Sequence, residues 1–318
     1  MPSTKAPMWP GIPTTSRDAL RPPPTASGPA PIDRPSDQAR VLREVSDLPT
    51  VVRPRYELPG DLRPASLVQR RRFYANRMDY RSAGDWMARP EGGRVYALIV
   101  GRHSGIYPRR FRHLKNVPLI IDDVSKARDL KPYLLRYLPE GVYYDRNVYA
   151  PLDETRAAQL DYVHAWRSRF FRGQELAFDL DPENLDCPIH GDIAAKMRRH
   201  QGLSFCDWEF EEIRRQTASL FDDLSTRWSR LRIVFSGRGF HIHVFDDAAF
   251  QLSRSGRARI AKAMARRYAI DEWVTSGEMR LIRLPYSLHG MVSRIVTPVP
   301  RGRLERFRYD DPRAVPRI

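Results

Sequence analysis

The clearest hydrophobic pattern in the chain is a strand-like alternation at residues 175–181. In an extended strand successive side chains point to opposite faces. One face would carry Leu176, Phe178 and Leu180, and the other Ala177, Asp179 and Asp181. Two like charges about 6.6 Å apart along one strand face repel each other, and one or two divalent cations would compensate them. The pattern predicts a metal site here, although a bare Asp-x-Asp also occurs at surface turns.

Similar patterns predict strands elsewhere, and these strands alternate with segments of helical period. The predicted strands are 94–100, 141–144, 232–235 and 240–245, with a further extended, basic segment at 106–112. The predicted helices are 36–45, 61–80, 129–137, 153–170, 203–231 and 253–268. Alternation of strands and helices predicts a mixed α/β fold. The helix at 61–80 contains three consecutive arginines, 70–72, which either contact nucleic acid or form a solvated face.

A tight turn at Ser236–Gly239 joins the strands at 232–235 and 240–245. Its glycines tolerate positive φ, and the turn offers backbone N–H groups, a hydroxyl and the Arg238 guanidinium together, which suits a triphosphate. On the return strand His241 and His243 share a face and can donate to phosphate oxygens. The alternative is an ordinary hairpin with satisfied histidines.

A third polar segment begins at Asp271 and continues through Arg280 and Arg283 to His289. Pro285 breaks the apolar run between the arginines and the histidine. A carboxylate followed by arginine and histidine would supply a third metal ligand and two phosphate donors.

Both cysteines of the chain lie close to two histidines, which favours a tetrahedral zinc site. The candidate ligands are Cys187, His190, His200 and Cys206. Asp192 or Glu209 are alternatives to His200. The other interpretation is two unrelated buried cysteines and two surface histidines, because the spacing is not that of a standard finger.

Composition adds a large positive charge to this picture. The chain has 318 residues and a formal net charge of +16, from 54 Lys+Arg against 38 Asp+Glu. This excess suggests a polyanionic partner, most plausibly nucleic acid, unless the source proteome is generally Arg-rich. Two cysteines argue against a disulfide framework, and no apolar run reaches the length of a membrane span. We expect no membrane association and an intracellular protein of the cytoplasm or nucleoid, with a disordered Pro-rich tail at 1–40.

Three of these segments together resemble the catalytic (small) subunit of archaeo-eukaryotic DNA primases. They are FDLD at 178–181, FSGRGFH at 235–241, and ID at 270–271 followed by RLIRLPYSLHG at 280–290. The last is similar to the archaeal form almost letter for letter. The turn is one residue shorter than the usual family motif. The resemblance covers roughly residues 60–318.

The resemblance implies roles for individual residues and a fold. Metal carboxylates fall on Asp179, Asp181 and Asp271, and nucleotide contacts fall on Ser236, Arg238, His241, Arg283 and His289. A family zinc site follows the first motif, where Cys187, His190 and Cys206 fit, with His200 as the favoured fourth ligand. The implied architecture is a mixed α/β catalytic domain at 41–318, carrying a small zinc-binding insertion at 186–207.

The implied function is a primase that makes short primers on single-stranded DNA from NTPs or dNTPs, using Mg2+ or Mn2+ at the carboxylates and Zn2+ in the insertion. In the family a large subunit assists initiation, so such a partner is expected as an option here. Two alternatives stay open at this point. One is a gap-filling or end-joining polymerase of the same superfamily, and the other is a catalytically inactive nucleic-acid-binding subunit.

Overall fold

The computed structural model describes residues 56–87, 94–122, 124, 126–150, 170–278 and 280–318. All of them belong to the second of two units into which the chain divides, residues 42–318. The tail predicted at 1–40 and the helices predicted at 36–45 and 153–170 lie outside the described residues. The predicted domain boundaries therefore stay a prediction.

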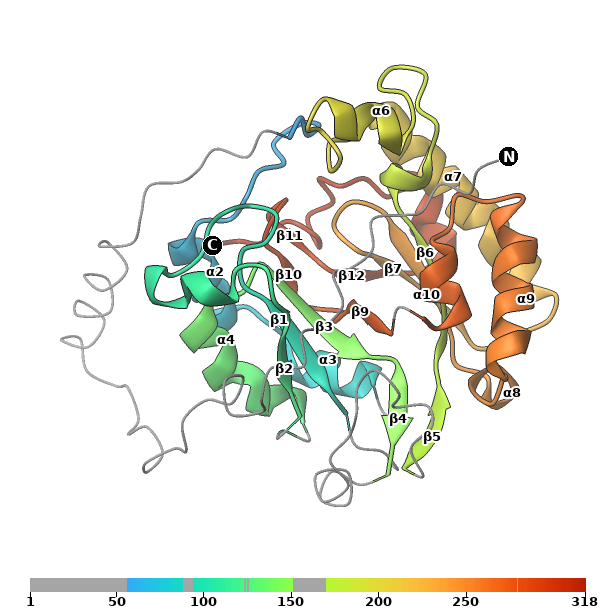
Figure 1. Ribbon diagram of the computed structural model, residues 1–318, viewed down its shortest axis with the longest axis horizontal. Coiled ribbons are helices and arrows are strands. Elements are labelled where there is room, and N and C mark those ends of the chain that lie inside the picture. The colour runs from blue at the N-terminus through green and yellow to red at the C-terminus, as the bar shows by residue number, and fades with distance from the viewer. Residues whose placement is uncertain (1–55, 88–93, 123, 125, 151–169, 279) are drawn as a thin grey trace. The chain divides into compact units, whose positions relative to one another are not determined.

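Two four-stranded antiparallel sheets form the centre of the described fold (Figure 1). The first sheet has the order β2-β1-β3-β9, formed by Leu119–Ile121, Tyr96–Ile99, Gly141–Asp145 and Leu281–Arg283. The second has the order β12-β7-β8-β6, formed by Thr297–Val299, Leu231–Phe235, Phe240–Val244 and Leu176–Leu180. Two short pairs complete the strands: β4 (Asn147–Tyr149) with β5 (Phe171–Gln174), and β10 (Leu288–His289) with β11 (Arg294–Ile295).

Helices cover the sheets on their outer sides. Around the first sheet lie α2 (Leu67–Asn76), α3 (Tyr80–Trp86) and α4 (Lys131–Tyr137), with the 3-10 helices η2 (Arg109–Leu114) and η3 (Ala127–Leu130). Around the second lie α7 (Asp207–Ser225), α8 (Asp247–Phe250), α9 (Arg254–Ala265) and α10 (Glu272–Ser276), with η5 (Pro182–Asn184) and η6 (Arg301–Arg306). Helix α6 (Ile193–Arg198) lies in a loop-rich extension above them (Figure 1).

The alternation along β6 decides which side of the second sheet is polar. Leu176, Phe178 and Leu180 are buried in a cluster with the apolar face of α7. Ala177 belongs instead to the cluster built on the first sheet. Asp179 follows Ala177 on that face, so its carboxylate points to the space between the two sheets. The predicted strand is confirmed over Leu176–Leu180, with the alternation of its faces, whereas Asp181 lies just beyond it as the N-cap of η5.

The predicted helical and extended segments are confirmed in part. The segment predicted as one helix at 61–80 forms α2 and α3, because Asp79 accepts a hydrogen bond from the Ser82 N–H and starts a new helix. The extended segment predicted at 106–112 is wrong, since η2 begins after Pro108. Phe111 and Leu114 are both buried there at the three-residue period of a 3-10 helix.

Arg70 corrects the idea that arginines 70–72 form a basic surface. It is fully buried in α2. Its guanidinium donates to three carbonyl oxygens of the loops around the first sheet, those of Val100, Ile106 and Leu138, at 3.0–3.2 Å. It also donates to the Ser104 hydroxyl at 3.0 Å. Arg70 therefore joins α2 to loops that contain no regular hydrogen-bond ladder of their own.

We predict that Arg70→Met lowers the free energy of unfolding by about 3 kcal/mol or more, because three buried carbonyls lose their donor while helix propensity is kept. Urea denaturation followed by circular dichroism measures the change. The matched control is Arg72→Met in the same helix, where the side chain is exposed. Equal losses for the two variants would contradict the structural role of Arg70.

Candidate active site

Three aspartates come together where β6 ends beside the segment that starts α10. The Asp271 N–H donates to the Asp179 carbonyl at 2.8 Å, and Leu180 pairs with Ile270 in an antiparallel bridge. These backbone contacts hold Asp179, Asp181 and Asp271 on neighbouring segments. Asp179 and Asp181 each have one buried carboxylate oxygen without a hydrogen-bond partner among the described residues.

The electrostatics of this cluster disfavour three bare negative charges. Burial, followed by the charges of Asp181 and Asp271, raises the pKa of Asp179 well above its ordinary value. Burial also raises the pKa of Asp271, although the N–H groups of Trp273 and Val274 oppose this by hydrogen bonding to its carboxylate. A divalent cation would stabilise such a site, because its positive charge would offset the repulsion between the carboxylates.

The turn between β7 and β8 fits tightly against the end of β6. Gly237 has φ +111°, and a Cβ there would lie 2.6–2.8 Å from the His289 ring. A Cβ on Gly239 would collide with the Leu180 carbonyl oxygen. The turn is closed by the Ser236 N–H donating to the Gly239 carbonyl and by the Gly239 N–H donating to the Ser236 hydroxyl. Both glycines are needed for the turn to reach the carboxylates.

Arg238 reaches back from this turn to a carboxylate that sequence reasoning missed. Its Nη1 lies 3.5 Å from Oε1 of Glu183, in the 3-10 turn after β6. Arg238 is 5% exposed, and its Nε and Nη2 have no hydrogen-bond partner among the described residues. Burial, followed by the charges of Asp181 and Asp271, raises the pKa of Glu183 against the opposing effect of Arg238. Two buried N–H donors of Arg238 are thus available for an anion.

Two histidines and a second arginine surround the carboxylates. The register of β6 and β8 places His241 opposite Asp179, with Nε2 3.4 Å from Oδ1. Burial and then His243 and Arg283 lower the pKa of His241 well below its ordinary value. Burial and then Arg283 and Arg238 do the same for the pKa of His289. Both imidazoles are therefore neutral, and each has an Nδ1 without a partner among the described residues.

The first sheet contributes the predicted Arg283 together with residues that the sequence did not single out, Tyr143, His103 and Glu140. Arg283 on β9 lies over the Tyr143 ring of β3, 4.8 Å from its centroid. His103 lies in the loop after β1, where burial lowers its pKa to about 4, with Glu140 opposing and Arg283 and Arg238 adding to the shift. The His103 N–H donates to the Glu140 carboxylate at 3.2 Å. No sequence pattern marks this loop, because its position depends on β1 pairing with β3.

A second cluster of metal-type ligands lies beyond η5. The ligand atoms of Cys187, His190, Cys206 and Glu209 all lie within 4.8 Å of one another. The Cys187 Sγ is 3.5 Å from His190 Nδ1 and 4.0 Å from Cys206 Sγ, and His190 Nδ1 is 3.2 Å from Glu209 Oε2. Ligands around a tetrahedral zinc ion are about 3.3–3.8 Å apart. Burial, together with the charges of Glu209 and Cys187, raises the pKa of Cys206 to about 11.

The fourth member of this cluster differs from the favoured sequence prediction. His200 is exposed and is absent from the group, while Glu209 is present. The reason is local: Cys206 is the N-cap of α7, and Glu209 reaches back from the third helical position to the Cys206 N–H at 3.0 Å. The side chain of Glu209 also accepts a hydrogen bond from the fully buried Lys196 ammonium.

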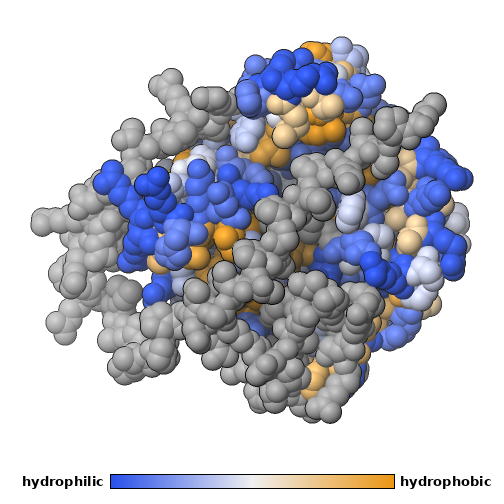
Figure 2. Space-filling view, in the orientation of Figure 1, coloured by the Kyte–Doolittle hydropathy of each residue, from blue (hydrophilic) through white to orange (hydrophobic). Residues whose placement is uncertain are grey.

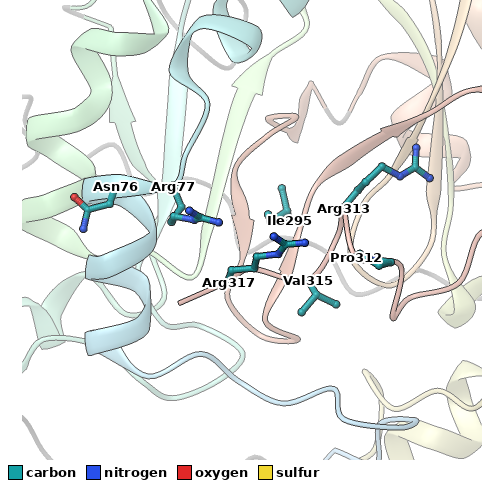
Figure 3. A pocket seen from close by; sticks show the side chains of 7 residues that line it. All are labelled: Asn76, Arg77, Ile295, Pro312, Arg313, Val315 and Arg317. Atoms are coloured by element: carbon teal, nitrogen blue, oxygen red, sulfur yellow. The ribbon is translucent and has the colours of Figure 1, made fainter.

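A separate shallow cavity of about 260 Å³ lies between the end of α2 and the C-terminal segment (Figure 3). It is lined by Asn76, Arg77, Ile295, Pro312, Arg313, Val315 and Arg317. This lining contains no carboxylate, thiol or imidazole, so it offers neither a hard-metal site nor a catalytic base. The carboxylate cluster is therefore the candidate active site.

None of the described helices has the length and apolar character needed to cross a membrane. The described chain is thus a mixed α/β protein in which two sheets enclose an acidic centre surrounded by arginine and histidine.

Comparison with known proteins agrees with this class. No family model matches the chain. An uncharacterized DNA primase small subunit-like protein of Archaeoglobus fulgidus is 49% identical over 260 residues, covering 81% of this chain and 91% of that protein. The chain therefore belongs to the DNA primase small subunit family, as the sequence motifs predicted.

More distant relatives have the same family name. The DNA primase small subunit PriS of Saccharolobus solfataricus is 27% identical over 59% of this chain and 66% of its own length. PriS of Methanothermobacter thermautotrophicus is 25% identical over 78% of this chain and 67% of its own length. Among solved structures, the polymerase domain of Mycobacterium tuberculosis Ligase D in complex with DNA aligns over 82% of this chain and 91% of that one, with a TM-score of 0.42 and 13% identity.

We predict that Asp179→Asn stabilises the metal-free protein at neutral pH, by about 1 kcal/mol. The folded-state pKa of Asp179 is raised, so its ionised form costs stability once the pH exceeds the ordinary range of an aspartate. Thermal unfolding in a chelator measures the gain. In excess Mn2+ the wild-type protein should instead have the higher unfolding temperature, because only it keeps all three carboxylates for the ion.

The control for this prediction is Glu272→Gln, which removes an exposed carboxylate beside Asp271. It should leave the melting temperature unchanged in the chelator. A destabilised Asp179→Asn protein under the same conditions would show that the carboxylate is satisfied without a cation.

Proposed function

We propose that this chain is a template-directed nucleotidyl transferase that makes short primers on single-stranded DNA. The observation that supports this most directly is the meeting of Asp179, Asp181 and Asp271, with unpartnered carboxylate oxygens, at the end of β6. Family membership supports the same reaction class. Gap-filling extension of an existing primer is the alternative that the experiment below separates.

The three aspartates would hold two divalent cations, Mg2+ or Mn2+. Oxygen ligands and a net charge of −3 suit hard cations of this kind. Such ions supply activation of the attacking 3′-hydroxyl and charge stabilisation at the phosphates. The fit rests on the two orphaned oxygens and on the raised pKa of Asp179, both of which indicate a missing counter-charge.

The triphosphate would lie against the donors that face this centre: Ser236, Arg238, His241, Arg283 and His289. Arg238 offers two unpartnered donor nitrogens, and the neutral imidazoles of His241 and His289 can each donate one hydrogen bond without adding charge. Arg283 lies over the Tyr143 ring and is close enough to Asp179 for its charge to oppose the rise in the pKa of that carboxyl, so it would meet the same ligand. These contacts orient the nucleotide for in-line attack.

We further propose that the second cluster binds Zn2+ through Cys187, His190, Cys206 and Glu209. The Cys187 sulfur accepts hydrogen bonds from the backbone N–H groups of Ile189 and His190, each at 3.4 Å. Such hydrogen bonds stabilise the negative charge of a thiolate ligand. Two thiolates, one carboxylate and a divalent ion leave one negative charge. The buried Lys196 ammonium neutralises it, which explains a lysine with no exposed surface.

Primer synthesis on unprimed single-stranded DNA tests the main proposal. The purified chain would receive labelled NTPs or dNTPs with Mg2+ or Mn2+. We expect short products that fall by several orders of magnitude in the Asp179→Ala, Asp181→Ala double variant, because the carboxylates act in the transition state. Arg283→Gln should lose less activity than the double variant, and its main effect should be a higher KM for the nucleotide.

The other outcomes identify the alternatives. Extension of an annealed primer without synthesis on unprimed DNA would favour either a gap-filling polymerase or dependence on a large subunit. Adding the cognate large subunit would separate these two. No incorporation in either assay, with DNA binding intact, would contradict catalysis and favour a binding subunit.

We predict that Glu209→Gln weakens zinc binding by about tenfold or more, because the ligand loses its charge while keeping its shape. His200→Ala should leave zinc binding unchanged. Competition with a coloured chelator measures both affinities on purified protein. A loss of zinc affinity in His200→Ala, with the affinity of Glu209→Gln unchanged, would instead support His200 as the fourth ligand.

A further inference from the structure

Trp273 is an exposed aromatic residue at the edge of the candidate active site. The residue is 53% exposed. Its backbone N–H donates to the Asp271 carboxylate at 2.8 Å, at the start of α10. A large ring left in solvent costs hydration free energy and gives no packing in return, so its position suggests a binding role.

Helix α9 beside it carries three exposed cations on one face. Arg259, Lys262 and Arg266 are spaced three and four residues apart, which places them within about 60° of each other around the helix axis. None of the three has an ion-pair or hydrogen-bond partner among the residues that the structure describes. The arginines at the two ends of this region do have partners, since Arg254 pairs with Glu278 and Arg267 with Asp223.

The two features lie on neighbouring elements, because α9 and α10 form an antiparallel helical hairpin. The Arg254–Glu278 pair joins the start of α9 to the end of α10. Trp273 lies five residues before Glu278, and Arg259 lies five residues after Arg254, so the antiparallel register sets Trp273 nearest in level to Arg259. Figure 1 shows the two helices side by side, and Figure 2 shows the α9 side of this face as mainly hydrophilic.

We propose that the α9–α10 hairpin binds a single strand of nucleic acid, with a base stacked on Trp273 and phosphates on Arg259, Lys262 and Arg266. This rests on the proposed function, since it assigns a path to the strand that enters the carboxylate site. The three cations span about 10 Å along the helix, and phosphates along one DNA strand are spaced by about 3.4 Å or more. Cations in a row beside an exposed aromatic ring are the usual composition of a single-strand site.

The test is equilibrium binding of a short labelled oligodeoxynucleotide, followed by fluorescence anisotropy over a range of salt concentrations, without nucleotide. In a triple variant with Arg259→Gln, Lys262→Gln and Arg266→Gln, we expect the slope of log K against log salt to become shallower by about 2. Each of the three lost phosphate contacts contributes about 0.7 to the slope. The control is a second triple variant with the same change in charge, Arg63→Gln, Arg112→Gln and Arg306→Gln, at exposed arginines elsewhere in the chain. Its slope should stay close to that of the wild type.

Stacking is tested separately from charge. Trp273→Ala should weaken binding about tenfold or more at every salt concentration, without changing the slope. Trp273→Phe should keep most of the affinity, because an aromatic face remains. Trp208→Ala, which removes a tryptophan that is 40% exposed at the start of α7, is the control for general loss of aromatic surface.

Three results would overturn the proposal: equal slope changes in the two charge variants, no loss with Trp273→Ala, or no binding by the wild-type protein. The first would show that net charge alone attracts DNA. A loss with Trp208→Ala as large as that with Trp273→Ala would count against this surface as well. If the wild-type protein binds DNA as described here but incorporates no nucleotide, the proposed function fails and the α9–α10 surface stands.

Discussion

The mutual repulsion of carboxylates gathered at the end of one strand is the constraint around which the described fold is arranged. Asp179 lies on the inner face of β6, Asp181 directly follows the last residue of that strand, and Asp271 is joined to the strand through its backbone N–H. Folding therefore brings negative charges into partly buried positions that raise the pKa of two of them. The surrounding arginines and neutral histidines reduce this cost only partly, because Arg238 is already engaged by Glu183. The proposed divalent cations would offset the part of this repulsion that remains.

Arginine has two different roles in this chain, and composition does not separate them. Several are buried and donate to backbone carbonyls, among them Arg70, Arg146, Arg257 and Arg294. These guanidinium groups satisfy buried carbonyls in loops and at the ends of strands and helices, such as those of Gln174 and Phe250. The formal charge of +16 thus overstates the charge that a nucleic acid partner would meet. The cations that count for such a partner are the exposed, unpaired ones, such as those on α9.

The sequence could predict the elements whose period determines their environment. Alternation was enough to assign Asp179 to the polar face of β6 and His241 to the face of β8 that it shares with His243, because the period of a strand is local geometry. The pairing of β6 with β8, which sets Asp179 opposite His241, comes from the structure. Glu209 was harder to choose over His200, since it joins the cysteines through the capping geometry of α7 and not through a ligand spacing. His103 and Glu140 could not be found at all from the sequence. Their approach to Arg283 depends on the pairing of strands far apart in the chain.

The position of the second ligand cluster directly after the first acidic motif has a structural consequence. Phe205 precedes Cys206, and the Arg238 guanidinium lies 5.7 Å from the centroid of its ring. Phe205 also belongs to the apolar cluster of the second sheet and is 2% exposed. A metal bound at Cys206 would therefore also restrain the aromatic ring against which Arg238 lies. Arg238 in turn contacts Glu183 beside the aspartates, so a chain of contacts joins the two ligand clusters.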